Sequence, residues 1–385
     1  MNDQELNGKN EVFFLKLKKT DAQDFIQFIK EKFSKESLIN QKYKIEQEGN
    51  YKLFPLIERK EIIDNIVKEI KNRISVEIIA KKAILNPNFK FRTLKEVLIG
   101  KIPPDYFNLI PSSYDVIGSI AILEFEKPDQ IKNKDFIDYK RLVANAVINI
   151  NKNVKSVFEK KSKIKGSYRL RDFVYLSGEN KTETVHKENN CVFHLDIKKT
   201  FFSPRLVYER RRISESRIKE GETIVDMFAG VGPFSIQIAQ LNHVEIHAFD
   251  LNPFAYSYLK KNLSSNRLDG MIFPYNINVR DLLNPTNQIG EKLRNSVDRI
   301  IMNLPESSID FIDVACFLMK TTGGILHFYN FLEKSKLINE TIKILEKKLS
   351  ESNWFMEEKF FSKIVKSYSP KTELFVIDLS IKFNS

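Results

Sequence analysis

The chain has 385 residues, more than one ordinary domain of roughly 150 residues, so two or three domains are expected. Hydrophobic residues make up 42% of it and include 30 Phe, a composition that excludes an intrinsically disordered chain. Lys and Arg total 62 against 50 Asp and Glu, a formal charge of +12. This excess suits a polyanionic partner such as RNA, although a lysine-rich surface alone gives the same count.

Cysteine and histidine usage argues against a disulfide framework and against a structural metal. Only Cys191 and Cys316 are present, and the five histidines show no zinc-site spacing. The amino-terminal residues lack the apolar region of a signal peptide, and no window approaches the roughly 20 apolar residues that cross a bilayer. We therefore expect a cytoplasmic protein that does not contact a membrane.

Residues 1–55 are predicted to form a small α+β module. EVFFLKLKK (11–19) is typical of a strand, and residues 20–33 have apolar residues at helical spacing behind Thr20, a candidate cap. YKIEQEGNYKLFPL (43–56) indicates a hairpin.

Residues 56–94 are expected to be a linker that contains a charged helix over roughly 58–84. A middle domain, residues 95–200, is predicted to be rich in strands. It contains an apolar strand at 116–125, a helix at 135–150 and a run of alternating segments that predicts several further strands.

Residues 201–385 alternate between strands and helices, which predicts a Rossmann-like α/β domain with a mostly parallel, doubly wound sheet. The expected strands are TIVDMFAG, VEIHAFDLNP, RIIMNLP, GGILHFYNF and LFVIDLSIKF.

The segment TIVDMFAGVGPFSI places Gly230 and Gly232 in the turn between a strand and a helix. Glycines there let the backbone approach a nucleotide-type cofactor, although tight turns in other folds contain the same residues. Asp250, 20 residues after Gly230, ends the next strand, where a carboxylate can accept hydrogen bonds from ribose hydroxyls. Ser235 stands where a dinucleotide-binding G-x-G-x-x-G motif has its third glycine, which disfavours a nicotinamide dehydrogenase.

Another apolar strand delivers Asn303 and Pro305 to its carboxyl end, in the crevice where open α/β sheets hold ligands. This segment resembles the substrate loop of methyltransferases that modify amino or ring nitrogens, although Asn and Pro also end ordinary strands. Together with the glycine turn and Asp250, it favours S-adenosyl-L-methionine as the cofactor.

Several motifs in one order carry a family resemblance: SSYDVIGSIAIL, GSYRLRDF, FFSPRLVYERRRI, VDMFAGVGPFSI, FDLNP and MNLP. From about Thr93 to Phe331 the chain resembles the archaeal and eukaryotic tRNA (guanine-37-N1)-methyltransferases. The first 55 residues are similar to an extra domain of some archaeal members. The resemblance implies methyl transfer from S-adenosylmethionine to N1 of the guanine 3′ of the anticodon.

The chemistry of this transfer calls for a base and a cation. N1 of neutral guanine carries a proton that a base must remove, and charge then gathers on O6. The resemblance assigns Glu209 as the base, Arg169 as the guanidinium at O6 and Asn303 as a contact to the guanine. Alternation predicts Arg169 and Arg171 on one strand face. Ser203 is the expected cap of the helix that carries Glu209, and without the resemblance an exposed Arg205–Glu209 ion pair is the simpler interpretation of that helix.

The predicted binding residues fall into two sets. The cofactor set is Phe228, Gly230, Gly232, Asp250 and Asn278. Many relatives have Asp at the position of Asn278, so Asp281 is an alternative contact to adenine. The RNA set is Arg205, Arg210 and Arg171, beside a run that continues through Arg211 and Arg212.

By the same resemblance the partner is a tRNA, contacted at its anticodon stem-loop and, by the amino-terminal module, at a more distant part, and the protein is a monomer. Two alternatives remain open. One is a methyltransferase that acts on a protein nitrogen or on another RNA position, including a tricyclic guanine derivative. The other is a non-catalytic RNA-binding protein with a vestigial methyltransferase fold.

Overall fold

The structure is a computed structural model that describes residues 11–32, 38–57, 68–71, 73–126, 128, 132–162, 164–335, 338–367, 369 and 371–384. The chain divides into two compact units, Met1–Glu96 and Val97–Ser385. Among the described helices, none combines the length and the apolar character needed to span a membrane.

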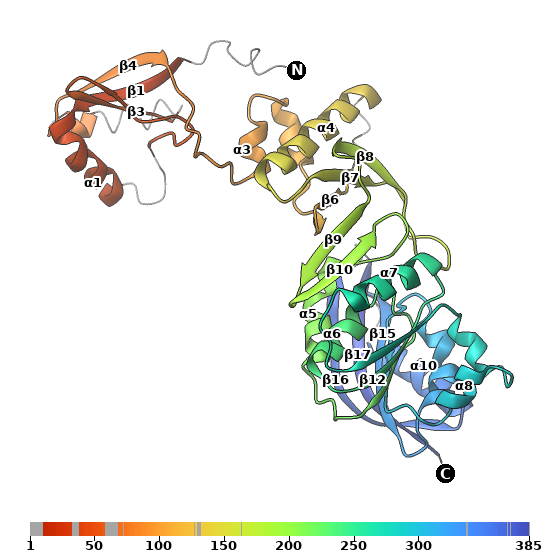
Figure 1. Ribbon diagram of the computed structural model, residues 1–385. Helices are drawn as coiled ribbons and strands as arrows, with labels where there is room; N and C mark the ends of the chain where they lie inside the picture. Colours follow the sequence, from red (N-terminus) through yellow and green to blue (C-terminus); the bar gives the residue numbers. More distant parts are fainter. Residues whose placement is uncertain are drawn as a thin grey trace. The chain divides into compact units, whose positions relative to one another are not determined.

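The amino-terminal unit contains an antiparallel sheet that packs against the helix α1 (Ala22–Lys32) (Figure 1). The strands, in spatial order, are β2 (Glu46–Glu48), β3 (Tyr51–Pro55), β1 (Glu11–Lys18) and β4 (Val76–Lys82). The core lies between sheet and helix, where the rings of Phe25 and Phe54 are 4.9 Å apart. The predicted strand, helix and hairpin are thus confirmed over the described residues, and Thr20 lies in a 3-10 turn before α1 rather than capping it.

β4 lies inside the segment expected to be a linker with a charged helix. It pairs antiparallel with β1 from Glu11↔Lys82 to Leu17↔Val76, so the pairing partner overrides the local helical pattern. The amino-terminal unit therefore extends further along the chain than the sequence pattern indicates. Residues 58–67 and 72 of the expected helix lie outside the described residues, and residues 68–70 are helical as predicted.

The first part of the second unit is a four-stranded sheet with one long helix against it. The sheet order is β5 (Asp115–Ile117), β6 (Ile120–Leu123), β7 (Ser156–Lys160) and β8 (Phe173–Gly178), and the helix α4 (Asn133–Ile150) connects the parallel pair β6 and β7. The single strand predicted at 116–125 is divided at Gly118, which has a φ of 55°. A Cβ there would lie 2.2 Å from Thr184 Oγ1, so this turn requires glycine. The short helix α3 (Leu94–Leu98) and the 3-10 turn η2 (Pro104–Leu109) precede this sheet, and the hairpin β9 (Glu183–Glu188) and β10 (Cys191–Asp196) follows it.

The rest of the second unit is built on a seven-stranded sheet of order β13-β12-β11-β14-β15-β17-β16. Its strands are β11 (Thr223–Asp226), β12 (Glu245–Phe249), β13 (Met271–Tyr275), β14 (Arg299–Met302), β15 (Gly324–Glu333), β16 (Trp354–Ser367) and β17 (Thr372–Phe383). β11 to β15 are parallel, whereas β17 and β16 continue the sheet antiparallel. This is the predicted Rossmann-like α/β fold.

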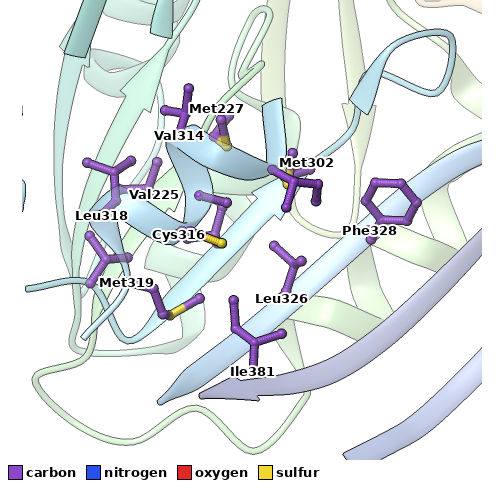
Figure 2. Packing of buried hydrophobic residues seen from close by; sticks show 14 of the residues in the cluster. Val225, Met227, Met302, Val314, Cys316, Leu318, Met319, Leu326, Phe328 and Ile381 are labelled. Carbon is purple, nitrogen blue, oxygen red and sulfur yellow. The ribbon is translucent and has the colours of Figure 1, made fainter. Parts of the chain in front are cut away.

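Helices cover both faces of this sheet (Figure 1). One face packs against α5 (Val207–Ser214), α6 (Pro233–Leu241) and α7 (Pro253–Ser264), and the other against α8 (Gln288–Leu293), α9 (Ile312–Leu318) and α10 (Ile338–Glu351). Figure 2 shows residues of α9 packed over the apolar side chains of the strands. β12, β11 and β14 are neighbours in the sheet, so their carboxyl ends bring Asp250, Asp226 and Asn303 to one edge.

Candidate cofactor and substrate site

The two glycines after β11 have different structural tasks. Gly230 has a φ of 59° and Gly232 a φ of 87°, both in the left-handed region that favours glycine. A Cβ on Gly232 would lie 2.4 Å from Leu259 Cδ1, inside the packed core. A Cβ on Gly230 would meet only the carbonyl oxygen of Phe201, at 3.9 Å. Gly232 therefore allows α6 to pack against α7. Gly230 lines the cavity, where the lack of a side chain leaves room for a ligand.

Asp250, at the end of β12, closes the glycine turn. The backbone N–H of Gly230 donates to its Oδ2 (2.7 Å), and that of Asn252 donates to its Oδ1 (2.8 Å). Burial raises the pKa of Asp250 above its usual range, and these two hydrogen bonds oppose the shift. Each carboxylate oxygen still has a lone pair for a further donor such as a ribose hydroxyl.

Asp226 and Ser235 explain why the third glycine of a dinucleotide motif is absent. The Ser235 hydroxyl donates to Asp226 Oδ2 (2.7 Å), and burial raises the pKa of Asp226 to about 7. Among the described residues, Asp226 Oδ1 has no hydrogen-bond partner. The serine thus binds the carboxyl group at the base of the turn, a contact that glycine cannot make.

A cavity of about 300 Å³ lies over the carboxyl ends of these strands. Its lining includes the predicted Phe228, Gly230, Asp250, Asn278, Asn303 and Arg169. Phe311 also lines the cavity and was not predicted. Its ring stands edge-on to that of Phe228 at 5.1 Å, and the Arg280 guanidinium lies 4.7 Å from the centroid of the Phe311 ring. Phe311 lies on a 3-10 turn (Ser308–Phe311) that no sequence motif marks.

Asn278, not Asp281, is the residue that the structure places at this cavity. The Asn278 side chain accepts the backbone N–H of Arg280 (3.0 Å) and so caps the 3-10 turn Val279–Leu283. Its amide is held at the cavity wall by this cap. The alternative contact through Asp281 has no support from the lining residues.

Arg169 lies at the cavity, but the prediction that it shares a strand face with Arg171 is wrong. It ends a turn with a φ of 56°, and β8 begins only at Phe173. Its guanidinium lies 5.1 Å over the ring of Phe201 and 3.4 Å from the Glu306 carboxylate. The Arg-x-Arg spacing resembles a strand, yet the chain turns back here because Lys165 and Leu170 pair.

A larger groove of about 1150 Å³ adjoins this cavity and shares Arg169, Phe201 and Ser203 with it. Its lining is rich in cations: Lys160, Lys161, Arg169, Arg171, Arg205, Lys366 and Lys371. Asp115, Glu124, Glu126 and Glu306 provide fewer opposing charges. The groove therefore favours an anionic ligand next to the cavity.

Lys366, on β16, is a groove residue that the sequence analysis missed. Its ammonium group donates to Ser203 Oγ (2.9 Å), so Ser203 does not cap the following helix as predicted. Burial, together with the nearby Arg205, lowers the pKa of Lys366 to about 8. Arg205 itself pairs with Asp115 (2.6 Å) rather than with Glu209.

Among the described residues that line the groove, Arg210 is absent, unlike the other two predicted RNA contacts, Arg171 and Arg205. Its side chain is 1% exposed and donates to both carboxylate oxygens of Glu188, at 2.5 and 2.6 Å. The guanidinium also donates twice to the Ser203 carbonyl (3.2 Å). These contacts engage the guanidinium and fix the Ser203 turn to the β9–β10 hairpin, so an RNA contact by Arg210 stays a prediction.

Glu209 is also buried, at 6% exposure. Its carboxylate accepts hydrogen bonds from the Tyr329 hydroxyl (2.8 Å) and from Arg212 (2.5 Å at the shortest). Among the described residues that line the cavity and the groove, Glu209 is absent. The structure thus brings Arg169 and Asn303 together at the cavity and places Glu209 in the layer behind its wall.

Profiles of known families match most of the second unit. The TYW2 N-terminal domain matches residues 94–182, and the TRM5/TYW2 methyltransferase domain matches residues 184–356. The tRNA (guanine(37)-N(1))-methyltransferase Trm5b of Pyrococcus abyssi is 32% identical over 89% of this chain and 92% of its own length. Trm5b of Methanocaldococcus jannaschii is 36% identical over 90% of this chain and 93% of its own.

Solved structures agree with these matches. The complex of aTrm5 with tRNALeu superposes with a TM-score of 0.71 at 33% identity, covering 96% of this chain and 99% of that chain. P. horikoshii TYW2 in complex with MeSAdo superposes with a TM-score of 0.62 at 28% identity, covering 76% of this chain and 98% of that one.

The match to the TRM5/TYW2 methyltransferase domain identifies the second unit as an S-adenosylmethionine-dependent methyltransferase, and its doubly wound sheet, glycine turn and acidic strand end agree with that class. The residues present fit this cofactor. The Asp250 carboxylate is free to bind ribose hydroxyls, the rings of Phe228 and Phe311 offer apolar walls for an adenine, and Asn278 offers an amide beside them. The chain belongs to the TRM5/TYW2 family, that of the tRNA (guanine-37-N1)-methyltransferases that its motifs resemble.

Proposed function

We propose that the protein transfers the methyl group of S-adenosylmethionine to N1 of guanine 37 of tRNA, the nucleotide 3′ of the anticodon. The observation that carries this proposal is the cationic groove, which adjoins the cofactor cavity at Arg169. A polyanion bound in the groove can deliver one base to the cavity. The relatives whose sequences match about nine-tenths of the chain act, by name, on this nucleotide.

The reacting base must leave the anticodon loop stack to enter the cavity. Arg171 and Arg205 lie in the groove and serve as contacts to phosphates beside that base. Arg205 is 46% exposed and shares its charge with Asp115, so it is accessible to RNA. The amino-terminal unit contacts a more distant part of the same tRNA.

The cofactor supplies an electrophilic methyl group, and the protein supplies the charges that guanine needs. The N1 electron pair forms the bond to the methyl carbon, the carbon–sulfur bond breaks, and the N1 proton passes to the Glu209 carboxylate. Arg169 donates to O6, where negative charge grows, and Asn303 hydrogen-bonds the guanine edge. Leu206 and Arg210, on either side of Glu209 in sequence, line the cavity, so guanine entry has to open this wall.

Product mapping tests the proposal. The purified protein is incubated with labelled S-adenosylmethionine and two tRNA transcripts that differ only in guanine or adenine at position 37. We expect label, and a primer-extension stop at position 37, only with guanine. Label on both transcripts would move the target elsewhere on the RNA, and cofactor binding without label on any tRNA would favour a non-catalytic RNA-binding protein.

The base assignment has its own test. Glu209→Gln keeps the shape of the side chain, but an amide cannot accept the proton as a carboxylate does. The rate of methyl transfer should therefore fall by about 100-fold or more, while cofactor binding persists. Glu215→Gln is the matched control, because Glu215 follows α5 and its carboxylate forms an exposed pair with Arg211. A transfer rate near that of the parent for Glu209→Gln would refute the assignment.

A further inference from the structure

The two oxygens of the Glu209 carboxylate have unequal surroundings. Oε1 accepts from the Tyr329 hydroxyl (2.8 Å) and from Arg212 through Nη2 (2.5 Å) and Nε (3.1 Å). Within the described part of the chain, Oε2 accepts only from Arg212 Nε, at 3.1 Å. One oxygen is therefore anchored, and the other keeps the lone pairs that a proton can use.

Arg212 also contacts Asp378 and Phe361. Its Nη1 donates to Asp378 Oδ2 on β17 at 2.5 Å, and its guanidinium lies 4.0 Å over the ring of Phe361 on β16. The Arg212 guanidinium thus donates to two carboxylates, those of Glu209 and Asp378, which are 169 positions apart in the sequence. Such a bridge fixes α5 to the antiparallel end of the sheet.

Asp378 is held in turn by His327, the next member of the same buried hydrogen-bond network. His327 lies on β15, with its Nδ1 2.7 Å from Asp378 Oδ1 and its Nε2 2.9 Å from Arg299. Because a guanidinium only donates, Nε2 accepts, and the ring proton lies on Nδ1 and is donated to Asp378. Burial would raise the pKa of Asp378, but His327 and Arg212 outweigh it and the pKa is lowered.

Arg299 completes the chain with two hydrogen bonds to Glu222, the shorter at 2.8 Å. Asp378, His327, Arg299 and Glu222 are all less than 9% exposed. Each link therefore has a defined donor and acceptor, and the chain has one stable arrangement rather than several. Its end at α5 is the Glu209 carboxylate.

We propose that Tyr329 and Arg212 are positioning residues that hold Glu209 by Oε1 and leave Oε2 to accept the guanine proton. The proposal rests on the assignment of Glu209 as the base. Tyr329 is suited to this task because burial and the neighbouring Glu209 raise its pKa well above the usual value, so the phenol stays a donor. The ring also packs against Phe234, a cavity residue, at 5.7 Å.

Tyr329→Phe tests the proposal, because it removes one hydroxyl and keeps the ring. We expect the single-turnover rate at saturating tRNA and cofactor to fall about tenfold, the scale of one hydrogen bond to a charged group. The tRNA KM and the cofactor Kd should stay at parent values. Tyr256→Phe is the matched control, since Tyr256 is half-buried on α7 and does not line the cavity or the groove.

A double variant separates positioning from a general loss of stability. In the Glu209→Gln background, Tyr329→Phe should cause no further fall in rate, because the hydroxyl acts through the carboxylate. An additive fall, or a parent rate for Tyr329→Phe alone, would overturn the positioning role while leaving the base assignment intact. A parent rate for Glu209→Gln would instead overturn both. If Tyr329→Phe does not fold, Arg212→Lys is the second variant, with the same expected split between rate and KM.

Discussion

A guanidinium that stacks on an aromatic ring has little freedom to swing, and Arg169 is held in this way over Phe201 at the junction of cavity and groove. Arg169→Ala should therefore remove the donor that we propose for O6. We expect the single-turnover rate to fall about 100-fold or more, near 3 kcal/mol of barrier. Arg171→Ala, a groove residue, should mainly raise the tRNA KM. If Arg169→Ala changed only the tRNA KM, Arg169 would be a phosphate contact.

The two glycines of the cofactor turn offer a matched pair at the same scale. Gly232→Ala forces a Cβ to within 2.4 Å of Leu259 Cδ1 in a backbone with φ of 87°, so the free energy of unfolding should fall by about 2 to 3 kcal/mol. Gly230→Ala adds only a van der Waals contact with the Phe201 carbonyl oxygen and should lose only about 1 kcal/mol, but Gly230 lines the cavity, so the added methyl group should weaken cofactor binding. Urea unfolding and calorimetric titration with S-adenosylmethionine measure both. Equal losses of stability would contradict this division of tasks.

Among the elements, the β9–β10 hairpin is tied to α5 by the buried Glu188–Arg210 pair. Glu188→Gln leaves the Arg210 charge buried without its counter-ion and should reduce stability by about 3 to 5 kcal/mol. Glu215→Gln, which breaks the exposed pair on the same helix, should cost less than about 1 kcal/mol. Urea unfolding at pH 7 measures both, and a loss for Glu188→Gln as small as that for Glu215→Gln would show that the pair does not brace the hairpin.

The same pair predicts how stability depends on pH. Burial would raise the pKa of Glu188, but His186 and Arg210 outweigh it, so the pKa is lowered in the folded state. A lowered pKa contributes stability that is complete above the unfolded value, about 4.3, and is lost as the pH falls through the folded value. Unfolding between pH 7 and pH 3 should therefore show a smaller acid-induced loss for Glu188→Gln than for the parent. Parallel curves would contradict this.

Elements with a complete local pattern could be predicted from the sequence. α4 and the turn from β11 into α6 depend on apolar spacing and on glycine, which are properties of the segment itself. β4 could not be predicted, because only its partner β1 makes a strand of this charged segment. The strand prediction at Arg169 was wrong for a similar reason, since an Arg-x-Arg spacing does not show where the chain reverses direction.

At the scale of the whole molecule, the same distinction separates the residues of the site. Asp250 and Asn303 follow strands, so the topology alone brings them together. The surroundings of Glu209 depend on Tyr329, 120 residues away, a pairing that no local spacing shows. The sequence therefore indicated which residues line the cofactor cavity better than it indicated the burial and the hydrogen bonds of Glu209, the proposed base.

The amino-terminal unit gives the last prediction. Removing residues 1–55 would take β1, β2 and β3 and leave β4 without its partner, so a chain that begins at Arg92 is the better variant. It keeps Thr93, whose hydroxyl accepts the backbone N–H of Glu96 at the start of α3 (3.2 Å). The cavity and the groove contain only residues of the second unit, so chemistry should survive.

We expect this shortened chain to show a tRNA KM raised roughly tenfold, about 1.4 kcal/mol of lost binding, with the rate at saturating tRNA within a factor of about two of the parent. An isolated anticodon stem-loop lacks the distant part of the tRNA, so both chains should use it with equal efficiency. A fall in the saturating rate on full tRNA would mean that the amino-terminal unit takes part in the transfer step itself. Equal KM values on full tRNA would mean that it makes no contact with this substrate.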